Sequence, residues 1–213
     1  MRIRFDEQLE QLNEEMINMG NMIEASIGNA VKALMKQDEE LAKKTMAGDE
    51  KIDRTERKIE DLCLRLLLQQ QPVARDLRNI SSALKMVTDM ERIGDHAVNI
   101  CDYTKLIEEK HIVFSDDAKQ QMEEMKMICE KMFHNISKVP EDTQEWLQKV
   151  HDSENFIDQK TEEFYESHLE RINRGECNDE ACIIFSEMLT DFERIGDHTW
   201  NVAKQMAKII ERG

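Results

Sequence analysis

A twelve-residue segment that occurs twice restricts the possible folds of this chain more than any other feature. Residues 88–99 read TDMERIGDHAVN and residues 190–201 read TDFERIGDHTWN, so nine of twelve positions are identical. The copies are 102 residues apart, close to half of the 213-residue length. A fainter match pairs three residues upstream of each copy, namely Asp49, Ile52 and Asp53 with Glu154, Ile157 and Asp158. A repeat at half the chain length predicts two structural units in tandem.

Each unit is expected to contain only helices. Apolar residues recur every three or four positions, which is the period of an α-helix, and 2 Pro and 7 Gly are too few for the turns of a sandwich or barrel. The pattern predicts six helices, at about residues 5–33, 38–70, 72–101 and beyond, 115–136, 143–173 and 178–212. We therefore predict an all-α fold of two tandem, pseudo-symmetric three-helix bundles. They span residues 1–110 and 114–213, with the boundary near residues 109–115.

Several predicted helix ends carry residues that favour them. Pro72 suits the first turn of the third helix, where its missing N–H costs nothing. Ser115 and Asn178 are expected to cap the fourth and sixth helices, because their side-chain oxygens can accept hydrogen bonds from first-turn N–H groups. Pro140 is expected to break the fourth helix, and Gly175 to end the fifth.

Composition excludes some functions and favours one compartment. A formal net charge of −16 repels polyanions, so nucleic acid is not expected as a partner. No apolar run of about 18 residues could span a membrane, and no apolar stretch follows the N-terminus as in a secretory signal. The five cysteines form no CxxC pair, and all but Cys177 lie in apolar helical patterns. They are interpreted as small core residues in a reducing compartment, so we expect a cytoplasmic protein.

Glutamate interrupts the apolar stripe of the third and sixth helices. The stripe that starts at Leu77 and passes through positions 80, 84 and 87 continues to Glu91, and in the second unit it continues to Glu193. The residues one and two turns later on the same faces are Asp95 and Asn99, and Asp197 and Asn201. Side chains at i, i+4 and i+8 line one face of a helix, so their oxygens can converge.

The neighbouring helix of each unit carries a second acidic pair with the same spacing, Asp49 with Asp53 and Glu154 with Asp158. Helix packing is expected to join the pairs, giving four carboxylates and one amide per unit. Such clusters repel and lose hydration unless a cation binds. Arg92 and Arg194 directly follow the glutamates and are expected to point about 100° away around the helix. Metal ions therefore become the expected counter-charge.

Oxygen-rich clusters favour Mg²⁺ or Mn²⁺, and iron or zinc becomes an option if His96 or His198 joins. Gly94 and Gly196 lie between the acidic residues of each copy, where a missing side chain would let a neighbouring helix or a metal-bound water approach. One alternative is a purely structural bundle in which the carboxylates form a polar network satisfied by Lys and Arg. Another is a carboxylate-bridged dimetal oxidase, but that class uses Glu-x-x-His, whereas Glu91 and His96 are five residues apart.

These residues resemble the PhoU family of bacterial phosphate-signalling regulators. The resemblance depends on QPVARDLR at residues 71–78, TDMERIGD at 88–95 and DFERIGDH at 191–198, and it covers essentially the whole chain. It implies a fold of two three-helix bundles. It also implies Glu/Asp-x-x-x-Asp motifs that bind multinuclear metal clusters, which correspond here to Asp49/Asp53, Glu91/Asp95, Glu154/Asp158 and Glu193/Asp197.

The resemblance also implies a role without catalysis. The family is similar in acting as a negative regulator of the phosphate-starvation response. Its members relay the state of a phosphate ABC transporter, through its ATPase subunit, to a membrane sensor histidine kinase from the cytoplasm. Membrane association is then expected only through these partners, and a homodimer is one option for the oligomeric state. Asp49 is shorter than the usual Glu, and residues 71–78 have no counterpart in the second half, so we expect the two metal sites to differ in nuclearity or affinity.

Overall fold

Six long helices make up the protein, as a computed structural model shows for residues 2–69, 73–136 and 141–211. They are α1 (Arg2–Lys36), α2 (Glu39–Gln69), α3 (Ala74–Glu109), α4 (Asp116–Ile136), α5 (Thr143–Asn173) and α6 (Asp179–Ile210). Within these ranges there is no strand, so the all-α prediction is confirmed. The predicted roles of Pro72 and Pro140 fall outside the described residues.

Side-chain caps begin several of the helices where the sequence indicated them. The Ser115 hydroxyl accepts a hydrogen bond from the N–H of Ala118 at 3.2 Å. The Asn178 side chain accepts from the N–H of Ala181 at 2.7 Å. Both bonds satisfy N–H groups that the first helical turn leaves without a partner. The caps on α4 and α6 are therefore confirmed, and they fix where the second bundle starts and where its last helix begins.

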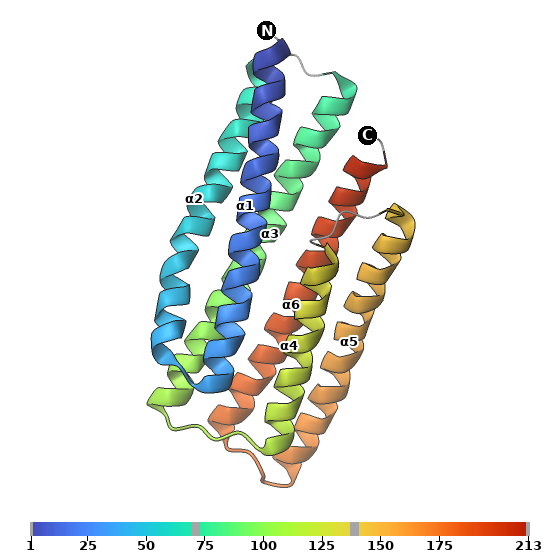
Figure 1. Ribbon diagram of the computed structural model, residues 1–213. Helices are drawn as coiled ribbons and strands as arrows, with labels where there is room; N and C mark the ends of the chain where they lie inside the picture. The colour runs from blue at the N-terminus through green and yellow to red at the C-terminus, as the bar shows by residue number, and fades with distance from the viewer. Residues whose placement is uncertain (1, 70–72, 137–140, 212–213) are drawn as a thin grey trace.

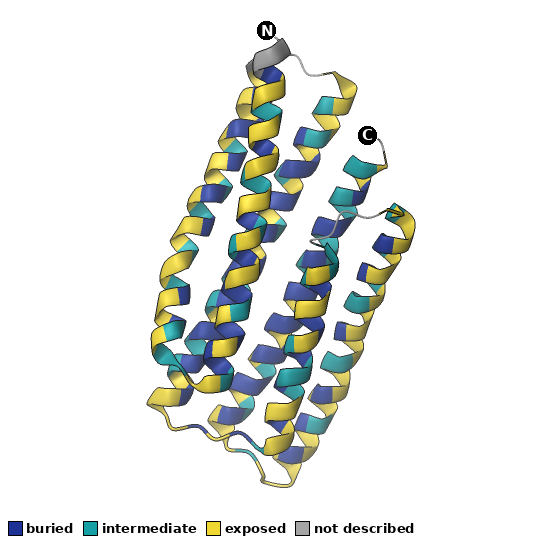
Figure 2. Ribbon diagram, in the orientation of Figure 1, coloured by how far each residue is buried: buried dark blue, intermediate teal, exposed yellow. Residues whose placement is uncertain are grey.

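The helices form two three-helix bundles that lie side by side, α1–α3 in one and α4–α6 in the other (Figure 1). The third helix of each bundle packs along the third helix of the other. Buried residues line the facing sides of all six helices (Figure 2) and form one continuous apolar core. The two repeats thus share a core, and the boundaries of the predicted units, 1–110 and 114–213, stay a prediction.

Helix α3 is buried on two sides because it contacts both its own bundle and α6. Ile80 and Val87 lie in the predicted stripe and are fully buried, whereas Met90 and Ile93, outside that stripe, are buried as well. Leu77, which the stripe placed inside, is 48% exposed, so this part of the prediction was wrong. A stripe computed for one buried face misses residues on a helix that has two.

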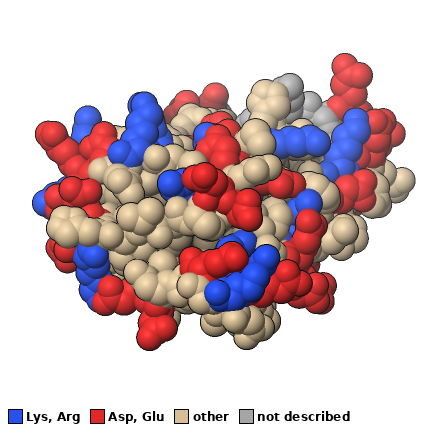
Figure 3. Space-filling model, turned by 90° about the horizontal axis from the view of Figure 1, so that it is seen from below, with Lys and Arg blue, Asp and Glu red and all other residues tan. Residues whose placement is uncertain are grey.

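Along the described ranges, no helix is both long and apolar enough to cross a membrane. Seen from below the view of Figure 1, acidic and basic side chains are interspersed among uncharged ones (Figure 3). This face carries no broad basic surface of the kind that nucleic-acid binding would require.

Candidate metal centres

In the first bundle, α2 and α3 bring the two predicted acidic pairs together. Gly94 allows this approach, because a Cβ built there would lie 3.3 Å from the Asp49 Oδ1 and 3.5 Å from the Ile52 side chain. The negative charges of Asp53, Asp95 and Glu91 all raise the pKa of Asp49. The expected close approach at this glycine is therefore seen, and it places the short side chain of Asp49 directly against α3.

The second bundle repeats the arrangement between α5 and α6. Carboxylate oxygens of Glu154, Asp158 and Asp197 lie within 4.8 Å of one another. Gly196 again permits the contact, since a Cβ there would lie 3.0 Å from the Ile157 Cδ1. Glu193 completes the set, because the charges of Asp158 and Asp197 act on it.

Burial and mutual repulsion raise the pKa of the carboxyl groups in both clusters. Burial, followed by the charges of Asp53, Asp95 and Glu91, raises the pKa of Asp49 to about 6. Burial is also the main cause that raises the pKa of Glu91, Glu154, Asp158 and Glu193, and a neighbouring aspartate adds to it in each case. A bound cation would reverse this effect by favouring the charged form.

One acidic residue that the sequence reasoning missed joins the first cluster. Burial and then the charge of Glu91 raise the pKa of Glu56, which lies on α2 one turn after Asp53. The spacing of 49, 53 and 56 on a single helix face could have revealed it. The corresponding position in the second bundle is Thr161, whose buried hydroxyl oxygen has no hydrogen-bond partner among the residues described.

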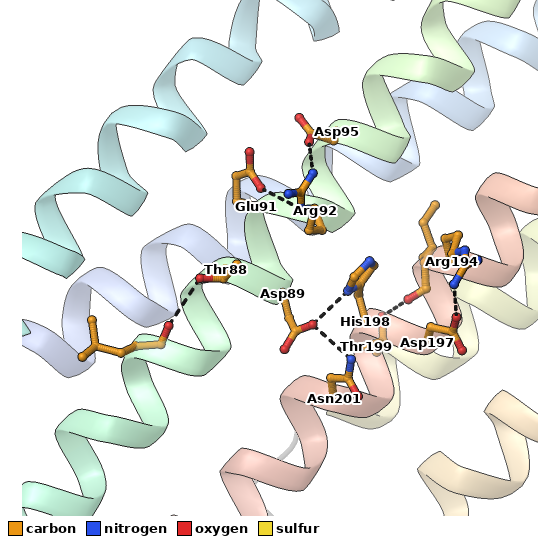
Figure 4. Close-up of polar contacts among 12 residues, drawn as sticks. Thr88, Asp89, Glu91, Arg92, Asp95, Arg194, Asp197, His198, Thr199 and Asn201 are labelled. Atoms are coloured by element: carbon orange, nitrogen blue, oxygen red, sulfur yellow. Dashed lines mark hydrogen bonds and ion pairs between the residues drawn. The ribbon is translucent and has the colours of Figure 1, made fainter.

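Arginines approach the clusters, contrary to the expectation that they would point away. Arg92 lies 3.6 Å from the Asp95 Oδ2 and 3.8 Å from the Glu91 Oε2, and Arg194 lies 3.3 Å from the Asp197 Oδ2 (Figure 4). The expectation was wrong because the long arginine side chain can reach along the helix to the carboxylate three residues later. Both arginine side chains are more than half exposed, so these pairs contribute little energy and neutralise the clusters only in part.

The two asparagines predicted as ligands belong to a different polar network. Asn99 donates from its amide to the Asp191 Oδ1 at 3.0 Å. Figure 4 shows the equivalent bond, in which Asn201 donates to the Asp89 Oδ1 at 3.1 Å. Each aspartate comes from the opposite repeat. The structure therefore corrects the idea of one converging face, because the amides point to α3–α6 contacts while the carboxylates face α2 or α5.

Histidines from the repeated segment complete this second network. His96 Nδ1 lies 2.6 Å from the Asp191 Oδ1, and His198 Nδ1 lies 2.8 Å from the Asp89 Oδ1. The two imidazole rings stack with their centroids 5.8 Å apart. Because carboxylates of the other repeat engage both rings, the histidines join the bundles rather than complete the acidic clusters. The histidine and the first aspartate of the segment are the same in both copies, although a metal-binding role explained neither of them. This repetition was the sequence signal that could have revealed the second network.

The repeated segment therefore contributes to two separate structures. Its Glu and second Asp enter the acidic cluster of their own bundle, while its first Asp, His and Asn bond across the α3–α6 contact. The cross-bundle contacts resemble each other closely but are not identical, because Tyr103 also donates to the Asp191 Oδ2 at 2.7 Å. The corresponding position in the second repeat is Gln205.

Two duplicated helical bundles, each with its own cluster of carboxylates, define a class of proteins with paired candidate metal centres. The chain belongs to the PhoU family, since the family model described as PhoU domain matches residues 16–104 and again residues 122–206. The resemblance drawn from the sequence motifs is thereby confirmed.

Relatives of known name cover nearly the whole length of the chain. A "Phosphate-specific transport system accessory protein PhoU homolog" from Clostridium acetobutylicum is 32% identical over 209 residues, covering 97% of this chain and 94% of the relative. The crystal structure of PhoU from Pseudomonas aeruginosa superimposes with a TM-score of 0.90 at 26% identity, covering 97% of this chain and 99% of the other. The phosphate transport system regulatory protein PhoU from Streptococcus pneumoniae, at 20% identity and a TM-score of 0.85, covers 97% and 96% and supports the fold.

Proposed function

We propose that this protein is a cytoplasmic, metal-binding accessory protein that restrains phosphate uptake and the phosphate-starvation response. In this role it links the ATPase subunit of a phosphate ABC transporter to a sensor histidine kinase and performs no catalysis itself. The observation that supports it most is the full-length relationship to a protein named as a phosphate-specific transport system accessory protein. Membrane association would then occur only through these partners.

The acidic clusters fit a metal-binding function. Both clusters offer only carboxylate oxygens. These like charges are partly buried, and the exposed arginines beside them compensate the charges only in part. The residues that would hold metal are Asp49, Asp53, Glu56, Glu91 and Asp95 in the first bundle, and Glu154, Asp158, Glu193 and Asp197 in the second. Oxygen-only donor sets favour Mg²⁺, Mn²⁺ or iron. Zinc fits less well, because His96 and His198 are already bonded to aspartates.

Metal binding is tested by thermal melting of chelator-treated protein titrated with Mg²⁺, Mn²⁺, Fe²⁺ and Zn²⁺. Binding to the native state alone raises the melting temperature with metal concentration. We expect the rise in the wild type and its loss in Glu91→Gln/Glu193→Gln. A matched control is Glu14→Gln/Glu162→Gln, which changes two exposed glutamates outside the clusters. A flat response in the wild type would contradict the metal-binding part of the proposal.

The regulatory role is tested in cells that have ample phosphate. Deletion of the gene should raise the expression of phosphate-starvation genes, and the wild-type chain supplied in trans should restore repression. Comparing Glu91→Gln/Glu193→Gln with the control pair then shows whether repression needs the clusters. Unchanged expression after deletion, in a genome checked for further copies, would overturn the regulatory role. It would not affect the result of the metal-binding test.

A further inference from the structure

A second group of metal-binding side chains lies at the junction of α5 and α6. It consists of His168 on α5, Cys177 in the connection and Cys182 in the first turn of α6. His168 follows Asp158 by ten residues on the same helix, so the two positions are about 15 Å apart along its axis. This group is therefore separate from the acidic cluster of the second bundle, and its donor atoms are of a different kind.

The three side chains are arranged closely enough to share one ion. A ring nitrogen of His168 and the Sγ atoms of Cys177 and Cys182 all lie within 4.8 Å of one another. Gly175, with a φ of +69°, ends α5 in a turn in which the Glu176 N–H donates to the Arg171 carbonyl oxygen at 3.0 Å. This turn returns the chain toward α5 and places Cys177 beside the start of α6.

His168 is prepared to act as a neutral ligand. It is 1% exposed, and its Nε2 lies 3.0 Å from the Cys182 carbonyl oxygen. A carbonyl only accepts, so Nε2 carries the proton and the neutral ring keeps its lone pair on Nδ1. With Nε2 bonded to the carbonyl, Nδ1 is the ring nitrogen that is free to bind a metal ion.

A buried arginine beside the group supplies a second, independent observation. Arg171 is 2% exposed, and its Nη1 donates to the Ser167 hydroxyl at 3.0 Å. Its Nη2 is buried without a hydrogen-bond partner in the described part of the chain. Arg171, His168 and Cys177 line the same cavity of about 10 Å³, which is the room that one water molecule or ion needs. A buried cation with a spare donor calls for a nearby anion.

Thiolates would provide that anion, but only when a metal holds them. A cysteine thiol loses its proton when it binds a metal ion, and the thiolate then carries the negative charge. Zinc favours thiolate and imidazole donors in tetrahedral sites. One Zn²⁺ with two thiolates and a neutral imidazole has no net charge, and it leaves thiolate sulfurs to accept from Arg171. The sequence interpretation of Cys182 as a core residue misses this, because the residue is half-buried and faces a second cysteine.

We propose that His168, Cys177 and Cys182 bind one zinc ion, which fastens the end of α5 to the start of α6. Binding forms two Zn–S bonds and one Zn–N bond, and both thiols release their protons to solvent. Water fills the fourth position, since the carboxylate of Glu176, another residue that lines the cavity, lies 3.6 Å from Arg174. The first repeat has no such site, because the positions that correspond to His168 and Cys182 are Cys63 and Ile80.

The test uses the full chain, reduced with a phosphine and freed of metal, in a Glu91→Gln/Glu193→Gln background that weakens the acidic clusters. Zn²⁺ is titrated against a chromophoric chelator, and Co²⁺ is used as a spectroscopic substitute. We expect one zinc per chain and a thiolate-to-cobalt charge-transfer band. The Cys177→Ser/Cys182→Ser variant should lose the band and bind zinc at least about 100-fold more weakly, whereas Cys129→Ala, a buried cysteine elsewhere, should keep both.

Two further results decide whether the site has the proposed composition. His168→Gln should weaken zinc binding by about 10-fold to 100-fold and shift the cobalt spectrum, and an unchanged affinity would remove the imidazole from the site. Cys177 lies partly exposed in the connection, so the single variant Cys177→Ser should fold and still lose affinity. The proposal is overturned if the reduced chain binds no zinc, even if peroxide can join the two cysteines in a disulfide.

Discussion

The acidic clusters of the two repeats have the same residue types, Glu and Asp, on α3 and α6 but differ in the charged residues around them. The first cluster gains a fifth carboxylate from Glu56, where the second has Thr161. In the second cluster, burial and the charge of Asp158 raise the pKa of Glu154, and His151 and Lys204 partly offset that rise. The position that corresponds to Lys204 in the first repeat is Asp102, of opposite charge. Duplicated motifs thus create two sites of unequal charge, and the first has the greater need for a cation.

The contacts between the repeats are unequal in the same way. The side chain of Asp191 is 7% exposed and accepts from His96, Asn99 and Tyr103. Asp89, its counterpart, has a side chain that is 21% exposed, and it bonds to two donors. The loss of a buried acceptor leaves its donors unsatisfied, whereas water can replace an acceptor that is partly exposed. The contact centred on Asp191 should therefore hold the bundles together more strongly.

The largest effect on stability is expected from removing the two aspartates that connect the bundles. Asp191→Ala should lower the free energy of unfolding by about 3 kcal/mol or more, because it leaves buried polar partners without an acceptor. Asp89→Ala should lower it by only about 1 kcal/mol, since solvent reaches that side chain. Chemical denaturation at neutral pH, followed by far-ultraviolet circular dichroism, measures both. Equal losses for the two variants would show that the third donor and the deeper burial do not matter.

Metal affinity offers a way to sharpen the first comparison. At a metal concentration of about 100 times the dissociation constant, stabilisation reaches about 2.7 kcal/mol, or a melting-temperature rise of about 5–10 °C for a chain of this size. We expect Glu91→Gln to remove more of this rise than Glu193→Gln, because the first cluster has more carboxylates. Differential scanning fluorimetry with Mn²⁺ over chelator-treated protein tests the order. A larger loss in Glu193→Gln would reverse the inferred ranking.

Much of the fold could be predicted because helical periodicity and capping are local properties. The caps at Ser115 and Asn178 involve atoms three residues apart, so the sequence contains all that is needed to recognise them. The exposure of Leu77 and the burial of Met90 depend instead on α3 packing against α6. A repeat length reveals that two bundles exist, but it does not reveal which faces meet.

The candidate sites show the same limit. Spacing placed Glu91 and Asp95 on one helix face, and the fainter repeat match indicated which residues of α2 oppose them. Asn99 shares their i+4 spacing, yet its amide bonds to Asp191 of the other repeat, because eight residues of a straight helix rotate the side chain away from the starting direction. Arg92 was misplaced because spacing fixes only the Cα–Cβ direction, whereas a long side chain can turn toward charge.

Glycine substitutions should separate packing from metal binding in the two clusters. A Cβ at residue 196 would lie 3.0 Å from the fully buried Ile157, so Gly196→Ala should destabilise the protein by about 1 kcal/mol after its gain in helix propensity. Gly94→Ala meets the Asp49 carboxylate at 3.3 Å, so its stability should stay near that of the wild type while Mn²⁺ affinity falls. Calorimetric melting with and without Mn²⁺ measures both. A loss of stability at Gly94 as large as at Gly196 would mean that the carboxylate cannot yield.

An effect limited to acidic pH is expected for the stability of the chelated protein. The pKa of Asp49 is raised to about 6 in the folded protein by burial and by Asp53, Asp95 and Glu91, above the value of 3.8 for the free side chain. The folded state therefore binds more protons between these values, and its stability falls as pH rises from about 4 to about 6. Asp49→Asn should remove that part of the decline, about 1 kcal/mol once solvent screening of this partly exposed group is allowed for. Denaturation midpoints of wild type and variant at pH 4, 5, 6 and 7, all in chelator, give the difference in stability between the two proteins. Saturating Mn²⁺ should invert the sign of this difference, because the ion needs the ionised carboxylate. A difference that does not change with pH would show that Asp49 is ionised throughout and that the first cluster is already compensated without metal.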